Sequence, residues 1–300
     1  MDSPLTWMWV PLAILAAGAA IAAPVPAPAP LEAEIQAWHD KRLKNLTAEE
    51  GWLSLVGLYW LEPGKNTAGS AEDSQVVFPL NAPARLGTFT LENGKVRLEM
   101  AKGVAATLKG KQFTGGVLKS DLEGEADTVH VGSIRFHLIQ RGEKFGIRAK
   151  DPQAKARAQF HGIPRYPVAA RWKVEAKFVP FAEPKKIAVP TVMGTVEELT
   201  AYGELVFSLD GQEHRLQPVQ DTPAEKLFVI FADPTNKKDS YGAGRFLYAD
   251  PPKNGKTTLD FNRSYNPPCA FSAFATCPLP PRENRLKVAI EAGEKRYGDH

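Results

Sequence analysis

Short runs of alternating apolar and polar residues recur along this chain, and turn-forming residues separate them. The sequence holds 24 Gly and 25 Pro, scattered between these runs. Asn93-Gly94 and Asp210-Gly211 each lie between two such runs, a pattern typical of tight β-hairpins. The chain does not alternate helix and strand patterns, which argues against a parallel α/β sheet. We therefore predict a mainly β fold, an antiparallel sandwich or barrel, as one domain or as two stacked β units.

One amphipathic helix is predicted before the strands, over residues 31–46, because its apolar residues fall near one stripe. The turn-rich stretch 151–167 is the best boundary between β units. A mainly β domain over 31–300 would then contain two sub-units, 31–150 and 168–300. Strands are expected over 76–78, 87–91, 95–100, 128–131, 134–140, 145–149, 172–179, 187–192, 205–209, 214–219, 226–231, 244–248 and 257–261, with 286–291 as a strand or a short helix.

The N-terminus has the pattern of an export signal. An apolar run from Trp7 to Ala23 ends in Ala20-Ile21-Ala22, which fits the small-x-small rule for cleavage. We predict a signal peptide over 1–22, then a stiff Pro/Ala-rich spacer over 23–30. The run is preceded by Asp2 and by no Lys or Arg, so retention as a membrane anchor is the alternative. The expectation is an exported protein, periplasmic or secreted, with no stable transmembrane anchor after processing.

Composition and motifs exclude several function classes. The formal net charge is +3 with no concentrated basic run, so we expect no nucleic-acid partner. The chain has no G-x-S-x-G, H-E-x-x-H, P-loop or dinucleotide-binding motif. No pair among its six His has metal-ligand spacing, so we predict neither a metal nor a cofactor.

The most informative stretch runs from Asp260 to Glu283, with the adjoining Asn284; we call it the 260–284 segment. It is too long and aromatic for a solvent loop, and two Pro-Pro pairs stiffen it. Buried polar groups of this kind must pair with one another or line a pocket. The candidate catalytic carboxyls are Asp260 and Glu283, and the candidate ligand-binding residues are Asn262, Arg263, Asn266 and Asn284. Arg263 suits a carboxylate partner such as Glu283. A fold-stabilising clasp built from the same residues is the alternative.

This segment resembles the hallmark of a bacterial family known as domain of unknown function 1684. The family has no assigned activity, so the resemblance implies no functional residue. The similarity covers nearly all of the mature chain. It is carried by Asp260-Phe261-Asn262-Arg263, Asn266-Pro267-Pro268-Cys269-Ala270-Phe271, Thr276-Cys277-Pro278-Leu279-Pro280-Pro281, Glu283-Asn284, Ala292-Gly293-Glu294, the run GWLSLVGLYWL at 51–61, and Tyr241-Gly242-Ala243-Gly244-Arg245-Phe246-Leu247.

Three function classes remain open, and whether the protein is an enzyme is not decided. The leading hypothesis is a β protein that binds a small-molecule or lipid ligand, with a polar site at the 260–284 segment. The second is a periplasmic hydrolase that uses the paired carboxyls Asp260 and Glu283. The third is an envelope interaction module. The only two cysteines, Cys269 and Cys277, are predicted to form a disulfide, because exported proteins with two cysteines usually oxidise them.

Overall fold

The computed structural model describes residues 30–298. The predicted signal peptide, 1–22, and the spacer up to residue 29 lie outside the described residues. Within residues 30–298, no helix combines the length and the apolar character needed to cross a membrane.

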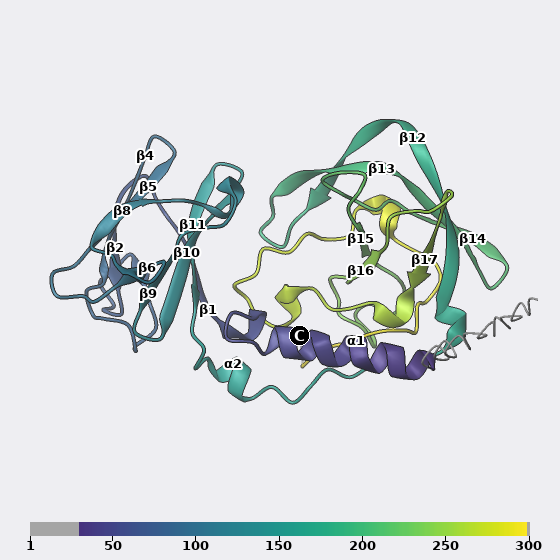
Figure 1. The fold of residues 1–300 in the computed structure, drawn as a ribbon, viewed down its shortest axis with the longest axis horizontal. Coiled ribbons are helices and arrows are strands. Elements are labelled where there is room, and N and C mark those ends of the chain that lie inside the picture. Colours follow the sequence, from purple (N-terminus) through teal and green to yellow (C-terminus); the bar gives the residue numbers. More distant parts are fainter. Residues whose placement is uncertain (1–29, 299–300) are drawn as a thin grey trace, which may run out of the picture.

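The N-terminal unit is a sandwich of two β-sheets that face each other across one hydrophobic core (Figure 1). Every strand pair is antiparallel except β2–β3. The six-stranded sheet has the order β1 (Leu55–Trp60), β11 (Lys144–Lys150), β10 (Ile134–Arg141), β9 (Thr128–Val131), β6 (Thr107–Leu108), β7 (Lys111–Gln112). The five-stranded sheet has the order β3 (Val76–Val77), β2 (Gly64–Gly69), β4 (Gly87–Glu92), β5 (Lys95–Met100), β8 (Gly115–Leu118).

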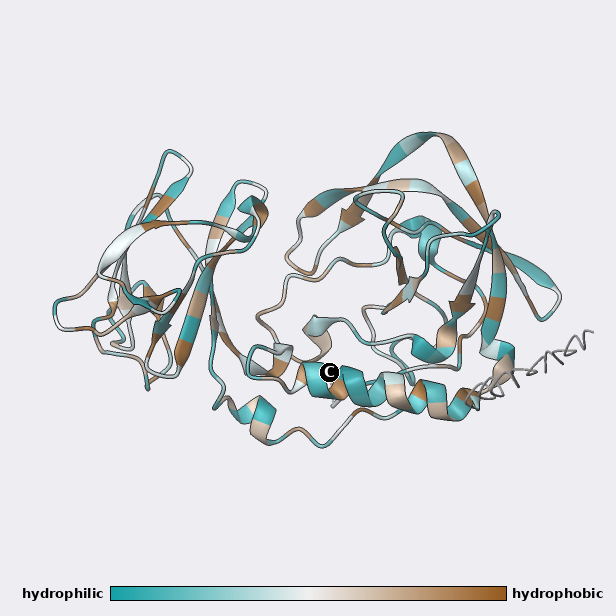
Figure 2. Ribbon diagram, in the orientation of Figure 1, coloured by the Kyte–Doolittle hydropathy of each residue, from teal (hydrophilic) through white to brown (hydrophobic). Residues whose placement is uncertain are grey.

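Alternation along the strands explains this packing. Phe136 on β10 faces Ala149 on β11, and both side chains are buried in the core between the sheets. The ring of Phe136 meets that of Phe89 from the opposite sheet edge-on, with centroids 5.9 Å apart. The intervening residues face outward, and Figure 2 shows the mixed hydrophobic and hydrophilic bands along β10 and β11.

The C-terminal unit is built on a long β-hairpin that arches over the remaining strands (Figure 1). This hairpin consists of β12 (Lys173–Pro190) and β13 (Val196–Leu209). It extends into a four-stranded sheet of order β14 (Gln212–Leu216), β13, β12, β17 (Lys256–Asp260). A separate pair, β15 (Leu227–Phe231) and β16 (Arg245–Ala249), lies beneath it. The predicted class, mainly β with an N-terminal helix, is therefore confirmed.

After β17 the chain continues as loops with single 3-10 turns. These turns are η4 (Phe261–Arg263), η5 (Pro268–Ala270) and η6 (Arg282–Asn284). The prediction of a strand or helix over 286–291 is wrong. The backbone of Ile290 bonds to side chains instead, because its N–H donates to Asp233 and its carbonyl accepts from Arg245.

Helix α1 (Leu31–Leu46) packs on the C-terminal unit rather than on the sandwich that follows it in sequence. Its last turn contributes Leu46 to a small core with Phe271. Arg42 donates to the carbonyl of Asn266. The structure therefore differs from the predicted sub-unit 31–150, which grouped the helix with the first β unit.

His39, on the buried face of α1, should make the protein sensitive to acid. Burial first, and then the positive charges of Arg165 and Arg42, lower its pKa from 6.5 to about 4, against a small opposing effect of Asp40. The unfolded chain therefore takes up this proton at a higher pH than the folded protein does. The unfolding free energy that depends on the neutral His39 imidazole is fully present above the unfolded pKa of 6.5. It is lost as the pH falls towards the folded pKa of about 4. Between roughly pH 7 and pH 4.5 we expect wild type to lose about 2 kcal/mol more unfolding free energy than His39→Gln, measured by urea unfolding. Equal losses in the two proteins would contradict this role.

Candidate functional site

Asp260 and Asn262 form a local network through Asp260 Oδ1, whereas the buried Oδ2 makes no hydrogen bond. Asp260 Oδ1 accepts from both the backbone N–H and the side-chain amide of Asn262. The same amide group is clamped onto the backbone of Ala169, donating to its carbonyl and accepting from its N–H, at 3.1 Å each. Both side chains are buried. These hydrogen bonds thus connect the end of β17 to the stretch before β12.

The partner of Arg263 is Glu34 on α1, with Asp260 Oδ2 at 3.4 Å from Nε. The predicted partner, Glu283, is exposed, and its side chain forms no ion pair within residues 30–298. The predicted pairing of Arg263 with Glu283 is therefore wrong. The carboxyls of Asp260 and Glu283 are not in contact. Asp260 precedes the turn η4, whereas Glu283 lies in the turn η6.

Asn266 and Asn284 also hold backbone segments together. Asn284 accepts from the N–H of Gln217 at 2.7 Å and donates to the carbonyls of Gln217 and Ile230. Asn266 donates through its side chain to the carbonyl of Lys295 and through its backbone to Glu294. These contacts favour the clasp interpretation of the predicted site residues.

Glu294 is the centre of this clasp. Its carboxylate, with no exposed surface, accepts from the guanidinium of Arg42 and from the backbone N–H of Asn266. Arg42 in turn lies over the ring of Tyr265, with Cζ 4.5 Å from the centroid. The stretch 286–295, which we call the C-terminal strap, is thereby fixed to helix α1.

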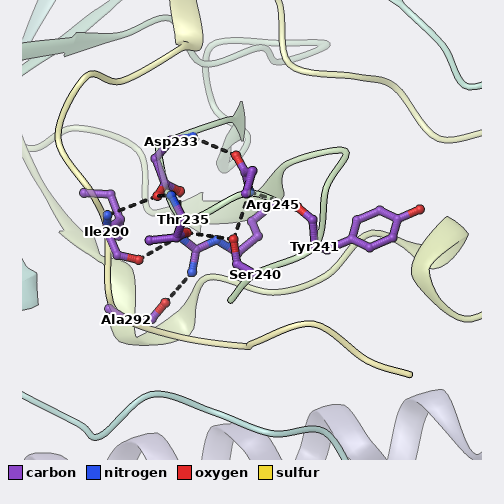
Figure 3. A network of polar contacts seen from close by, with 8 residues as sticks. Asp233, Thr235, Ser240, Tyr241, Arg245, Ile290 and Ala292 are labelled. Atoms are coloured by element: carbon purple, nitrogen blue, oxygen red, sulfur yellow. Dashed lines mark hydrogen bonds and ion pairs between the residues drawn. The ribbon is translucent and has the colours of Figure 1, made fainter. Parts of the chain in front are cut away.

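A second buried network surrounds Arg245, a residue absent from the predicted site (Figure 3). Its side chain is fully buried and pairs with the equally buried Asp233 at 2.7 Å. It also donates to the carbonyls of Ile290 and Ala292. The burial of Arg245 in the core could not be predicted from the local sequence, because its carboxylate and carbonyl partners are 12 or more residues away.

Two glycines permit these close approaches. Gly244 has φ +93°, and a Cβ there would lie 2.6 Å from the carbonyl oxygen of Phe231. Gly293 has φ +75°, and a Cβ there would lie 2.9 Å from the carbonyl oxygen of Phe261. Both positions therefore exclude side chains on steric and conformational grounds.

The two residues at the centre of the predicted site should differ in their effect on stability. Asn262→Ala leaves the backbone N–H and carbonyl of Ala169 without their partners, at a cost of about 2 kcal/mol. Arg263→Ala removes a partly exposed ion pair and should cost less than about 1 kcal/mol. Urea unfolding of the two variants measures the difference. The reverse order would show that Arg263, not Asn262, holds the segment in place.

Cys269 and Cys277 are neighbouring free thiols in the structure. The backbone N–H of Cys269 donates to Cys277 Sγ at 3.2 Å. The two residues are thus close together, and the disulfide stays a prediction.

A large concave surface lies elsewhere, between the β-sandwich, α1 and the β15–β16 pair. Three cavities of about 670, 570 and 310 Å³ adjoin one another because they share lining residues. The cavities of about 670 and 570 Å³ share the lining residues Trp52, Phe246 and Pro268. The cavities of about 670 and 310 Å³ share Phe228 and Tyr248. We call this continuous surface the aromatic cleft.

Stacked aromatic rings form the floor of the aromatic cleft. Tyr248 stacks on Phe228 with centroids 4.8 Å apart and on Tyr265 at 6.4 Å. Phe246 meets Phe228 edge-on at 4.9 Å. Although Tyr248 is in the middle of this stack, 49% of its surface is exposed. Burial raises the pKa of Tyr265, so its phenol is neutral and serves as a hydrogen-bonding and stacking group.

Cationic side chains lie at the rim. Lys41 and Arg42 of α1 line the cavity of about 670 Å³, together with Lys226, which directly precedes β15. Lys226 also contacts Asp250 at 3.1 Å. The 260–284 segment contributes to the cleft through Tyr265, Asn266, Pro268, Phe271, Thr276, Cys277 and Pro278. Of the predicted polar site residues, only Asn266 is among them. Within the described residues, no cluster of three or more His, Cys, Asp or Glu side chains could hold a metal ion.

Comparison with known proteins matches residues 158–295 to the model of a protein family of unknown function, DUF1684. The chain belongs to this family. The DUF1684 region includes the clasp and the aromatic floor of the cleft, whereas α1, Trp52 and the whole β-sandwich precede it.

Solved structures similar to this DUF1684 protein include an uncharacterized protein of Haloarcula marismortui, at 31% identity. That match covers 48% of this chain and 81% of the other, with a TM-score of 0.41. The FHA domain of FhaA matches 30% of this chain and 96% of its own at 15% identity, TM-score 0.22. An FHA domain of a Mycobacterium tuberculosis ABC transporter matches 29% of this chain and 77% of its own at 20% identity, TM-score 0.22. No curated protein matches the chain.

Proposed function

We propose that this protein binds a small organic molecule whose flat, apolar body lies in the aromatic cleft. The observation that carries the proposal is the open aromatic stack. Tyr248 continues a stack with Phe228 and Tyr265, yet 49% of its surface is exposed and it lines a cavity of about 670 Å³. That volume is within the range of roughly 300–1,000 Å³ typical of small-molecule sites.

The composition of the walls supports a planar ligand. Aromatic rings gain most from a partner that stacks on them or meets them edge-on. Trp38 and Trp52 stand in the lining of the same cavity, and 37% of Trp52 is exposed. A ring entering the cleft would therefore meet aromatic surface from α1, from the start of the sandwich and from β16. Lys41 and Lys226 at the rim would contact polar substituents of the ligand.

The other two hypotheses have less support from the geometry. A hydrolase using Asp260 and Glu283 needs both carboxyls at one reacting centre, and neither lines the aromatic cleft. Asp260 is instead bonded to Asn262. An envelope interaction module rests on the predicted exported spacer alone, which lies outside the described residues.

Export is part of the proposal and rests on the leader pattern at 1–22. Its test is the mature N-terminus, which mass spectrometry of protein from the native host should place near Ala23. Retention of Met1 on a cytosolic product would contradict it. In that compartment we also expect Cys269 and Cys277 to be oxidised to a disulfide. Thiol titration of the denatured mature protein should then find no free thiol.

Binding of a neutral aromatic probe tests the proposed function. N-phenyl-1-naphthylamine becomes fluorescent in apolar sites, and we expect saturable binding to wild type. Tyr248→Ala should weaken its affinity at least about fivefold, because it removes the central ring of the stack. Tyr202→Ala is the matched control, since Tyr202 is a partly exposed tyrosine outside the cleft. Equal affinities for wild type and Tyr248→Ala would contradict the proposal.

A further inference from the structure

The geometry points to an anion-binding subsite at the sandwich end of the aromatic cleft, formed by Arg141, Arg148 and Thr276. We infer that it takes a carboxylate or phosphate group of a small organic ligand. The nature of the ligand's apolar body rests on the proposed function, whereas the anion contact does not. The subsite lines the cavity of about 570 Å³ between the two units.

The pleat of the six-stranded sheet positions Arg148. Its neighbours in β11, Ile147 and Ala149, are buried in the sandwich core. Arg148 therefore faces the other side of the sheet, opposite Leu58 on β1 and His137 on β10. This is the side on which the C-terminal unit lies, and Thr276 of the 260–284 segment approaches it there.

Arg148 is buried without a carboxylate partner. Only 5% of the residue is exposed. Within residues 30–298 its side chain donates one hydrogen bond, from Nη2 to Thr276 Oγ1 at 3.1 Å, and its buried Nε has no partner. The guanidinium also lies 5.6 Å from the ring centroid of Trp52. Burying a charge is unfavourable unless an opposite charge accompanies it. An anion in the adjoining cavity would supply that charge.

Thr276 shows where the anion would be held. Arg141 Nε donates to its hydroxyl oxygen at 3.2 Å, and Arg148 Nη2 donates to the same oxygen. The two lone pairs of this oxygen are thereby used, and its own proton remains to be donated. Two converging guanidinium groups and one hydroxyl donor are the groups that bind carboxylate or phosphate oxygens.

The nearby acidic groups leave the subsite available to an anion. Asp121 pairs with Arg141 at 2.8 Å, and the structure pairs no carboxylate with Arg148. Glu197 and Glu198 line the same cavity but form no ion pair with either arginine. Burial and then Arg141 lower the pKa of Arg148 to about 10, so it stays charged at neutral pH. Burial and the charge of Arg148 hold the pKa of His137 at about 4, so the imidazole is neutral there.

The shared walls connect this subsite to the aromatic cleft. Trp52, Phe246 and Pro268 line both cavities, so a ring in contact with them could direct an anionic substituent towards Arg148. The ligand class that fits both ends is a small amphipathic anion with a planar apolar body. Such a molecule would contact the sandwich and the C-terminal unit at once.

Three matched probes test the inference: 2-naphthoate, 2-naphthyl phosphate and the neutral 2-naphthamide. We expect wild type to bind at least one of the anions about tenfold or more tightly than the amide in calorimetric titrations. The better anion identifies carboxylate or phosphate as the preferred group. Arg148→Met should abolish the preference while leaving amide affinity unchanged. Arg215→Met, at an exposed arginine paired with Glu204 and Glu213, is the matched control and should keep the preference.

Inorganic phosphate provides an arm that does not depend on the aromatic body. It should raise the melting temperature of wild type and of Arg215→Met, but not of Arg148→Met. Without any ligand, Arg148→Met should melt no lower than wild type, because it removes an unpaired buried charge, whereas a purely structural arginine would leave a less stable protein. If the anions bind no better than the amide and phosphate has no Arg148-dependent effect, the anion subsite is refuted. If phosphate acts through Arg148 but no naphthalene probe binds, the subsite stands and the proposed function fails.

Discussion

Replacing Arg245 with methionine is expected to lower the free energy of unfolding by about 3–5 kcal/mol, the range for breaking a fully buried ion pair. The substitution leaves the carboxylate of Asp233 buried without its cation. It also removes the donors to the carbonyls of Ile290 and Ala292, which hold the C-terminal strap against β16 (Figure 3). No solvent can replace these bonds, since neither side chain of the pair is exposed.

Urea unfolding followed by circular dichroism measures this loss. Arg215→Met is again the control, because Arg215 is exposed and its ion pairs should contribute little to stability. Arg245→Lys is the second variant, for use if Arg245→Met does not accumulate as folded protein. Lysine keeps the charge but not the planar guanidinium, so this variant should unfold at a lower urea concentration than wild type but at a higher one than Arg245→Met. A loss below 1 kcal/mol for both variants would show that the buried network contributes little to stability.

Glu294→Ala should have the second largest effect, a loss of about 3 kcal/mol. The change leaves the backbone N–H of Asn266 and the guanidinium of Arg42 without their acceptor. Because Arg42 retains some exposure to solvent, we place the cost at the low end of the range for buried pairs. Helix α1 should then detach from the C-terminal strap more readily.

A double-mutant cycle separates the pair from its surroundings. If Arg42 and Glu294 act as one unit, Arg42→Met combined with Glu294→Ala should cost clearly less than the sum of the two single changes. Glu213→Ala, on an exposed carboxylate that contacts Arg215, serves as the control for loss of a surface charge. Additive losses would mean that the two residues stabilise the fold independently.

The strands could be predicted from the sequence wherever local alternation and turn chemistry determine them. The Asn93-Gly94 turn joins β4 and β5, and Asp210-Gly211 joins β13 and β14, as expected from tight-turn residues with positive φ. The apolar residues of 286–291 suggest a strand or a helix, but this segment forms neither. The backbone of Ile290 is instead hydrogen-bonded to the side chains of Asp233 and Arg245.

The candidate site was harder to predict, because its residues come from distant parts of the chain. The amide of Asn262 finds its partner at Ala169, 93 residues away, so a polar residue that looks available in sequence is fully bonded in the fold. The cleft combines Trp52, Arg148 and Tyr248 from three separate segments, and only Trp52 lies in a run that carries the family resemblance. The 260–284 segment was rightly singled out as ordered, but its aromatic residues rather than its charged ones face the cleft.

Where a ligand binds can be followed most directly by NMR during titration of labelled protein with 2-naphthyl phosphate. We expect saturable shifts of the Trp52 indole N–H and of the backbone N–H groups of Thr276 and Tyr248, which line the aromatic cleft. The indole of Trp172, buried in the core of the C-terminal unit, should not move. Shifts centred instead on Asn262, Arg263 and Asn284, with the Trp52 signal unchanged, would contradict binding in the aromatic cleft and would place the ligand at the clasp.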